Sequence, residues 1–373
     1  MKGRSLYTTI NLYENNILLF IVSHIHLLLV HHSSTAVIMT AQQEIPKTGT
    51  RTTLVPSIST FLEDHPDLHL GGSGDFHAER AHHLSTFGIH ALPKDKIHPI
   101  HSVEFTAIRG PHGTIPIRIF YPSTGEAKRK SKQAAALIYF HGGGYTVGSV
   151  DEFENGLRTL AEESGVQIYA VDYRLAPEWR FPVQLDEYSA VIDWVQGTGG
   201  ASRGVHPDLV LGGGDSAGGN MTAAITLRRI DEKKKPLRAQ ILLYPEARVP
   251  FDTPAAVENN SGYYLECNGI FSFADHYCPR GTPPSHRYIS PGMQELKKLE
   301  GQPPAGVYTS GFDPLRDVGV EYASKLREAR NEVTWRHYDG MTHGWLQMTA
   351  WSEEAGECVR DVARDVKKFA YGS

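Results

Sequence analysis

Apolar runs that alternate with segments of helical spacing dominate the chain after residue 133. The run "AAALIYF" at 134–140 is continuously apolar, as expected of a strand buried on both faces. Strands that alternate with helices form β-α-β units around a mainly parallel sheet. We therefore predict an α/β fold in which helices flank such a sheet. Further strands are expected at 166–174, 208–214, 239–245, 305–312 and 333–340, and helices at 152–164, 183–196, 216–230, 318–330 and 352–370.

Two segments with alternating apolar residues precede this pattern, at 101–110 and 114–122. The turn residues "PHG" between them predict a β-hairpin, which brings the expected number of strands to eight. Residues 40–98 are polar, rich in His and interrupted by Pro and Gly. They predict a leader followed by short helices, for example over residues 58–70.

Residues 246–290 interrupt the α/β pattern and are rich in Pro, Gly and aromatic side chains. A loop of this length without structure of its own is uncommon in a compact domain. We interpret the segment as a helical insertion that covers part of the molecule. Its aromatic residues either line a pocket or pack the insertion itself: Tyr263, Tyr264, Phe271 and Phe273.

The apolar segment Ile17–Val30 leaves three interpretations open. It is shorter than the roughly 20 residues of a membrane-spanning helix, and two His interrupt it. The functional chain starts at Met39, or the segment is the core of a signal peptide with small residues at 34–36 as its cleavage site, or it is a membrane anchor. Residues 1–50 are therefore treated as a leader, and a cytoplasmic location is favoured over a secreted or membrane-anchored one.

Two features would matter only in a secreted protein. A disulfide between Cys267 and Cys278 is conceivable there, but the odd number of Cys favours free thiols. Asn220 and Asn259 begin N-glycosylation sequons. Asn220 is expected to be inaccessible in a tight turn, so only Asn259 could be glycosylated.

Charge and composition narrow the class of partner. The net charge is −5 with both signs mixed along the chain, so no nucleic-acid partner is expected. A membrane contact is expected only through Ile17–Val30. The His pairs at 31–32 and 82–83 lack metal-ligand spacing, so no metal is expected. A homodimer stays open as an alternative.

The sequence Gly214-Asp215-Ser216-Ala217-Gly218 fits the pattern G-x-S-x-G between an expected strand and an expected helix. In that context the glycines allow a sharp turn that exposes the Ser216 hydroxyl at the carboxyl end of the sheet. A serine hydroxyl needs a neighbouring base to act as a nucleophile. Ser216 is therefore the candidate nucleophile.

An acid and a histidine should follow Ser216 in this order, each on a loop after a strand. His343 lies in "DGMTHGW" after the last expected strand, and Asp313 lies in "GFDPLRD" after the one before. Asp317 is the rival acid, but its position suits the first turn of the next helix. We therefore predict Asp313 as the acid and His343 as the base.

Donors for a developing oxyanion are expected in "FHGGGY", after the first buried strand. Consecutive glycines leave their N–H groups open to a ligand oxygen. Gly143, Gly144 and Ala217 are predicted to form an oxyanion hole. His141 and Asp215, which belong to the same two motifs, are assigned structural roles.

The chain resembles the hormone-sensitive lipase family of α/β-hydrolases. The resemblance covers roughly residues 135–348 and rests on six motifs in order: "HGGGY", "DYRLAPE", "GDSAGGN", "LLYP", "FDPLRD" and "GMTHGW". It implies an α/β-hydrolase fold over 51–373, with a helical cap made from about 51–98 and about 246–290.

The resemblance also implies an activity. Family members cleave small-molecule esters of short to medium acyl chains without a cofactor. A Ser216–His343–Asp313 triad would act through an acyl-enzyme. Alternatives within enzymes are a deacetylase, a lactonase or an acyltransferase acting on a secondary metabolite. A non-catalytic small-molecule receptor on the same fold is the alternative of another class, but receptors that resemble this family have lost the catalytic His that is present here.

Overall fold

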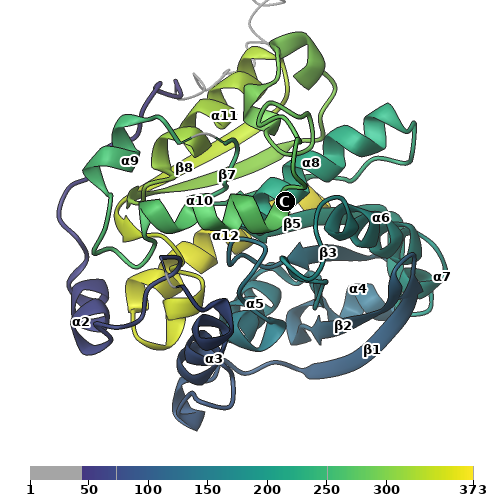
Figure 1. Cartoon of the computed structure of the whole chain (residues 1–373). Helices are drawn as coiled ribbons and strands as arrows, with labels where there is room; N and C mark the ends of the chain where they lie inside the picture. The colour runs from purple at the N-terminus through teal and green to yellow at the C-terminus, as the bar shows by residue number, and fades with distance from the viewer. Residues whose placement is uncertain (1–43, 73, 250, 373) are drawn as a thin grey trace, which may run out of the picture. The chain divides into compact units, whose positions relative to one another are not determined.

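An eight-stranded sheet forms the centre of the computed structural model, which describes residues 44–72, 74–249 and 251–372. The strands lie in the order β1-β2-β4-β3-β5-β6-β7-β8 (Figure 1). The pairs β1/β2 and β2/β4 are antiparallel and the other five are parallel. The predicted α/β-hydrolase fold and its hairpin are confirmed. The strands are β1 (Ser102–Gly110), β2 (Gly113–Tyr121), β3 (Ala134–Phe140), β4 (Gln167–Val171), β5 (Val205–Asp215), β6 (Gln240–Leu243), β7 (Ala305–Phe312) and β8 (Val333–Thr342).

Both faces of the sheet are buried, which explains why the central strand β3 is apolar throughout. In β3, Leu137 and Tyr139 belong to the hydrophobic cluster on one face, whereas Ile138 and Phe140 belong to the cluster on the other. Successive side chains of a strand point to opposite faces, so in a strand covered on both sides every side chain faces the protein interior. Such strands are therefore mostly apolar.

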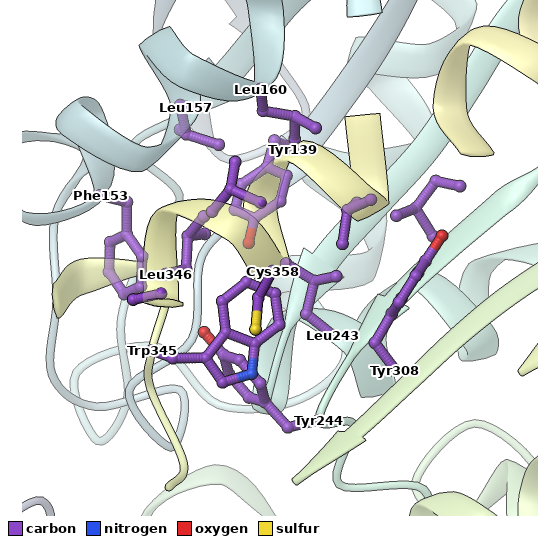
Figure 2. Close-up of a cluster of buried hydrophobic side chains, with 14 of the residues drawn as sticks. Tyr139, Phe153, Leu157, Leu160, Leu243, Tyr244, Tyr308, Trp345, Leu346 and Cys358 are labelled. Atoms are coloured by element: carbon purple, nitrogen blue, oxygen red, sulfur yellow. The ribbon is translucent and has the colours of Figure 1, made fainter. Parts of the chain in front are cut away.

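Helices cover the two faces in the order expected for β-α-β units. Figure 2 shows side chains of α5 and α12 packed with those of β3, β6 and β7 on one face. Helices α6, α8 and α11 contribute to the clusters on the other face. The helices are α4 (Glu126–Lys130), α5 (Val150–Ser164), α6 (Val183–Gln196), α7 (Thr198–Ala201), α8 (Ala217–Asp231), α11 (Arg316–Glu328) and α12 (Glu353–Tyr371).

The two segments predicted to form the cap are helical and touch each other. The first contains α2 (Pro56–Asp64) and α3 (Phe76–Phe87), and the second contains α9 (Pro254–Glu258) and α10 (Cys267–Tyr277). Leu70 forms a parallel β-bridge with Leu265, and its N–H donates to the carbonyl of Tyr264 at 2.8 Å.

The helix expected over 58–70 is shorter than predicted. It ends at Asp64, because Pro66 disfavours helical geometry at the residue before it. The chain then turns at residues 66–67, where the Leu68 N–H donates to the carbonyl of His65 at 3.0 Å, and Leu70 pairs with the insertion.

An extended segment at Gly49–Val55, here called the N-terminal strap, runs along the edge strand β8. The N–H of Thr52 donates to the carbonyl of Asp339 at 3.2 Å, and that of Val55 to Gly340 at 2.9 Å. The strap therefore pairs with backbone groups that an edge strand would otherwise expose.

The leader segment Ile17–Val30 lies outside the described residues. Within the described ranges, no helix combines the length and hydropathy needed to cross a bilayer. Cys267, Cys278 and Cys358 are all free thiols, as the odd number of Cys predicts.

Candidate active site

Ser216 lies in the turn between β5 and α8, with φ 52° and ψ −120°. A positive φ is strained for a residue with a Cβ and is typical of a turn that presents a nucleophile. The turn is fixed at both backbone groups. The Ser216 N–H donates to the carbonyl of Leu243 at 2.8 Å, and its carbonyl accepts from the N–H groups of Asn220 and Glu246 at 3.0 and 3.2 Å.

The glycines around Ser216 are required by close packing of the backbone. A Cβ at Gly218 would lie 1.8 Å from the carbonyl oxygen of Phe140, at the end of β3. No side chain larger than hydrogen fits there unless the glycine loop that follows β3 moves. The G-x-S-x-G pattern thus brings the serine turn against the strand that leads into "HGGGY".

Asp313 and His343 are in direct contact. Nδ1 of His343 lies 2.8 Å from Oδ2 of Asp313, and the two side chains are 0–1% exposed. The residues before them, Phe312 and Thr342, are paired across β7 and β8, which brings the two loops together. A carboxylate only accepts hydrogen bonds, so Nδ1 carries the proton and Nε2 presents its lone pair.

The ring of His343 lies beside the end of β6, next to the serine turn. Its centroid is 4.6 Å from that of Tyr244. Tyr244 directly follows Leu243, and the carbonyl of Leu243 accepts the Ser216 N–H. Nε2 of His343 is buried and makes no hydrogen bond to any residue that the structure describes. This nitrogen is therefore available as a base, and catalytic hydrogen bonds are often long before substrate binds.

Asp317, the rival acid, has a different set of partners. It lies in the first turn of α11, as expected, and its carboxylate accepts the N–H groups of Gly49 and Ala255, both at 2.9 Å. Arg316 adds an ion pair at 2.8 Å. Both carboxylate oxygens of Asp317 accept hydrogen bonds from the strap or α9, so the residue joins these two segments to α11. It does not contact His343.

The glycine loop after β3 leaves its N–H groups open. Gly143 has φ 99°, and its carbonyl accepts from Thr146 and Val147 at 3.0 and 2.8 Å. Within the described ranges, the N–H groups of Gly143, Gly144 and Ala217 donate no hydrogen bond to the protein. These three predicted donors are therefore free to bind an oxygen of a ligand.

Asp215 ties this loop to the serine turn. Its Oδ1 accepts from the Gly142 N–H and the Tyr139 hydroxyl, both at 2.9 Å. Burial raises the pKa of Asp215 to about 6, although both hydrogen bonds act to lower it. The residue is placed to position the loop, in agreement with the structural role expected for it.

His141 is packed inside the same loop. Its ring stacks with those of Phe153 and Tyr173, whose centroids are 5.3 and 4.5 Å away, and Nδ1 donates to the carbonyl of Gly142 at 2.8 Å. Burial lowers the pKa of His141, so it is neutral at neutral pH. These contacts fit the predicted structural role.

Arg80 of α3 also contacts this loop, and no sequence pattern pointed to it. Its Nε donates to the carbonyl of Thr146 at 2.6 Å, and Nη2 donates to that of Ala176 at 2.9 Å. Glu178 pairs with both ends of the guanidinium. An isolated Arg in a polar helix carries no motif that could have identified it.

The insertion places two of its aromatic residues against the site. A Cβ at Gly144 would lie 2.1 Å from the ring of Phe273, and one at Gly344 would lie 2.7 Å from that of Tyr264. Both rings are buried, whereas Phe271 is 49% exposed. Phe273 thus packs against the glycine loop itself, and Tyr264 packs against the residue after His343.

The expectation that Asn259 could be glycosylated is wrong. Its side chain is fully buried, and Nδ2 donates to the carbonyls of Gly311 and Asp313 at 3.1 and 3.0 Å. A carboxamide with both donors occupied inside the protein cannot carry a glycan. Asn220 is fully buried, as expected.

Comparisons with known proteins agree with this geometry. A family described as having the α/β-hydrolase fold matches residues 137–347. Carboxylic ester hydrolase LipN of Mycobacterium tuberculosis is 32% identical over 305 residues, which cover 79% of this chain and 78% of that protein. Arylacetamide deacetylase of Bos taurus is 30% identical over 292 residues, which cover 62% of this chain and 72% of that protein.

Solved structures give the same result. The hyperthermophilic esterase from Pyrobaculum calidifontis is 30% identical and superimposes with a TM-score of 0.78, covering 86% of this chain and 99% of that one. The match in sequence and structure extends across the sheet and the loops at its carboxyl edge. The chain therefore belongs to the hormone-sensitive lipase-like family of α/β-hydrolases.

Proposed function

We propose that this protein is a serine ester hydrolase that cleaves small-molecule esters of short to medium acyl chains. The observation that carries the proposal is the buried His343–Asp313 contact beside a strained serine turn. The family relationship supports the same activity, because relatives that match most of this chain are carboxylic ester hydrolases and esterases by name.

In the proposed mechanism, the Ser216 hydroxyl attacks the ester carbonyl while Nε2 of His343 takes its proton. The negative charge that develops on the carbonyl oxygen is stabilised by the N–H groups of Gly143, Gly144 and Ala217. Asp313 keeps the proton on Nδ1 of His343 and stabilises the imidazolium that forms.

The tetrahedral intermediate collapses when His343 protonates the leaving alcohol, which leaves the acyl group on Ser216. Water then enters, gives its proton to His343 and attacks the acyl carbon. The second intermediate releases the carboxylic acid and restores the Ser216 hydroxyl. Each proposed step uses only this chain's side chains, its backbone and water.

Amide cleavage is a second candidate, because arylacetamide deacetylase of Bos taurus is 30% identical to this chain. The same residues would act, but His343 would have to protonate a poorer leaving group.

The proposal is tested by hydrolysis of p-nitrophenyl esters from C2 to C12, with wild type and Ser216→Ala side by side. Loss of such a nucleophile lowers kcat by about 10⁶-fold. Matched acetanilides separate ester from amide cleavage. Retained activity in Ser216→Ala, or a folded wild type that cleaves none of the esters, would overturn the assignment.

A further inference from the structure

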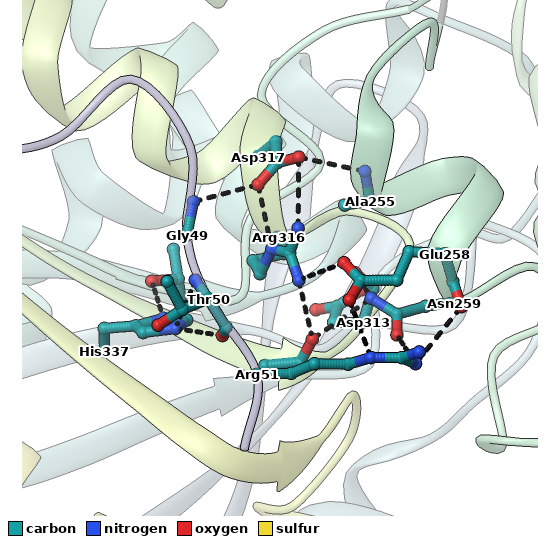
Figure 3. Close-up of polar contacts among 12 residues, drawn as sticks. Gly49, Thr50, Arg51, Ala255, Glu258, Asn259, Asp313, Arg316, Asp317 and His337 are labelled. Atoms are coloured by element: carbon teal, nitrogen blue, oxygen red, sulfur yellow. Dashed lines mark hydrogen bonds and ion pairs between the residues drawn. The ribbon is translucent and has the colours of Figure 1, made fainter.

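The backbone of the loop that carries Asp313 is bonded to one residue of the insertion. Nδ2 of Asn259 donates to the carbonyls of Gly311 and Asp313, at 3.1 and 3.0 Å (Figure 3). The two carbonyls lie on either side of Phe312, where β7 ends. Asn259 therefore fixes the point at which the strand gives way to the acid loop.

Arg51 of the strap determines how the Asn259 carboxamide is oriented. Its Nη1 donates to Oδ1 of Asn259 at 2.9 Å and to the carbonyl of Glu258 at 3.2 Å. A guanidinium has donors only, so the carboxamide atom that faces it must be the oxygen. The NH₂ group is consequently directed at the two carbonyls of the acid loop.

Arg51 is itself held in place. Its Nε pairs with Oε1 of Glu258 at 2.7 Å, and the guanidinium lies over the rings of Tyr263 and Phe312, 5.8 and 5.3 Å from their centroids. Glu258 also pairs with Arg316 at 2.7 Å, which ties the end of α9 to the start of α11. Figure 3 shows these charged groups gathered around the acid loop.

The same insertion segment also reaches the histidine loop. The hydroxyl of Thr342, the residue before His343, lies against the carbonyls of Tyr263 and Phe312. Residues 258–263 thus contact the chain immediately before both Asp313 and His343.

We propose that Asn259, oriented by Arg51, is a positioning residue that holds the Asp313 loop against His343. This inference rests on the proposed function of Asp313 and His343. It makes the strap and the insertion part of the catalytic support, together with Arg316, whose Nη1 and backbone N–H donate to the same two carbonyls at 3.3 and 3.1 Å.

The test uses Asn259→Asp, which keeps the shape and the acceptor for Arg51 but removes both donors. A shift of about 1 Å in a catalytic group costs about 10²-fold, and we expect kcat on p-nitrophenyl acetate to fall by about that factor with KM little changed. Rates are divided by the number of active sites, counted by titration with a p-nitrophenyl phosphonate. A purely structural role would lower the number of sites and leave kcat per site unchanged.

Asn331 provides a matched control. Its Nδ2 also donates to two backbone carbonyls, of Leu299 and Leu326, at 2.8 and 2.9 Å, but Asn331 precedes β8, whereas His343 follows the other end of that strand. Asn331→Asp should cost stability and leave kcat per site at the wild-type value.

Arg51→Ala is a second variant, less disruptive because Arg51 is 28% exposed. We expect kcat per site to fall by about tenfold, as expected when a charged hydrogen bond is lost, with partial recovery in Arg51→Lys. The control is Arg287→Ala, because Arg287 is 23% exposed and likewise pairs with one carboxylate and one carbonyl.

The outcomes separate the two proposals. If wild type cleaves the ester and the phosphonate blocks it, but Asn259→Asp and Arg51→Ala keep kcat per site, the positioning role is wrong and the esterase stands. If wild type neither cleaves the ester nor reacts with the phosphonate, the proposed function fails, and this inference fails with it.

Discussion

The two sides of the candidate active site are held in place by different parts of the chain. On the oxyanion side, the glycine loop is bonded mainly by residues of the recognisable motifs, Asp215 and Tyr173. On the acid–base side, the loops of Asp313 and His343 are bonded to Asn259 and Tyr263, residues of the insertion.

The difference shows which side of the site is more sensitive to a change of the insertion. The oxyanion side is bonded mainly to residues next to Ser216 in the fold, and the predicted cap reaches it through Arg80 and Phe273. The acid–base side depends on a segment that is predicted to form part of the cap. A change of insertion that alters specificity is therefore expected to disturb Asp313 and His343 before it disturbs the oxyanion hole.

Asp313→Asn should break the acid–base side most severely. The amide keeps the packing but presents a donor that favours the wrong tautomer of His343, so kcat should fall by about 10⁴-fold. Steady-state kinetics per titrated site measure the effect. Asp317→Asn is the comparison, and we expect it to lower Tm far more than kcat. Equal losses of kcat in the two variants would contradict the choice of Asp313.

Gly143→Ala should break the oxyanion side to a smaller extent. The added Cβ would lie 2.1 Å from the carbonyl oxygen of Val147 at φ 99°, so the loop must shift. Loss of one oxyanion donor costs on the order of 10²–10³-fold in kcat. Gly301→Ala places a Cβ at φ 74° with no atom within 4 Å, so it reports backbone strain alone. A Gly143→Ala variant as active as Gly301→Ala would show that this N–H is not used.

Arg80→Ala sharpens the comparison, because Arg80 is a contact from the N-terminal cap segment to the oxyanion side. Asp215 still holds the loop in this variant. We therefore expect kcat to fall by about tenfold, the lower end of the range for a lost charged hydrogen bond. The measurement is kcat per titrated site against Arg287→Ala. A loss as large as that of Gly143→Ala would mean that the oxyanion side also depends on the cap.

Glu246→Gln should give the smallest effect of these variants, and we expect it in the free energy of unfolding. Burial raises the pKa of Glu246 to about 8, against a hydrogen bond with Tyr145 that lowers it. A carboxyl whose pKa is raised on folding favours the folded state at low pH, and this contribution is lost as pH rises from about 4.5 to about 8.

Calorimetry at several pH values between 5 and 9 tests this sign. The Tm of Glu246→Gln relative to wild type should increase with pH and level off above the Glu246 pKa. The exposed Glu300 provides the control variant, Glu300→Gln. A Tm difference that stays constant with pH would show that Glu246 is ionised throughout.

The sheet and the contact between Asp313 and His343 could be predicted from the sequence, for physical reasons. Strands such as β3 are buried on both faces and must be apolar throughout, and Ser216 needs glycines around it. Asp313 and His343 follow strands that are neighbours in the sheet, so their order along the chain already places them together.

The supports of the site could not be predicted in the same way. Arg51 and Arg80 act through single guanidinium contacts to residues far along the chain, and neither position carries a local pattern. Asn259 did lie in a pattern, but the sequon suggested an exposed residue, whereas its carboxamide is buried under the acid loop. Only the three-dimensional packing of the insertion decides whether Asn259 is exposed or buried.

The most direct test of the account is mass spectrometry of the protein after reaction with a p-nitrophenyl phosphonate. The account predicts one phosphonyl group, mapped by proteolysis to the peptide that contains Ser216, and a strongly slowed reaction in His343→Ala. Labelling of another residue, or an unchanged rate without His343, would contradict the assignment of Ser216 and His343 as nucleophile and base.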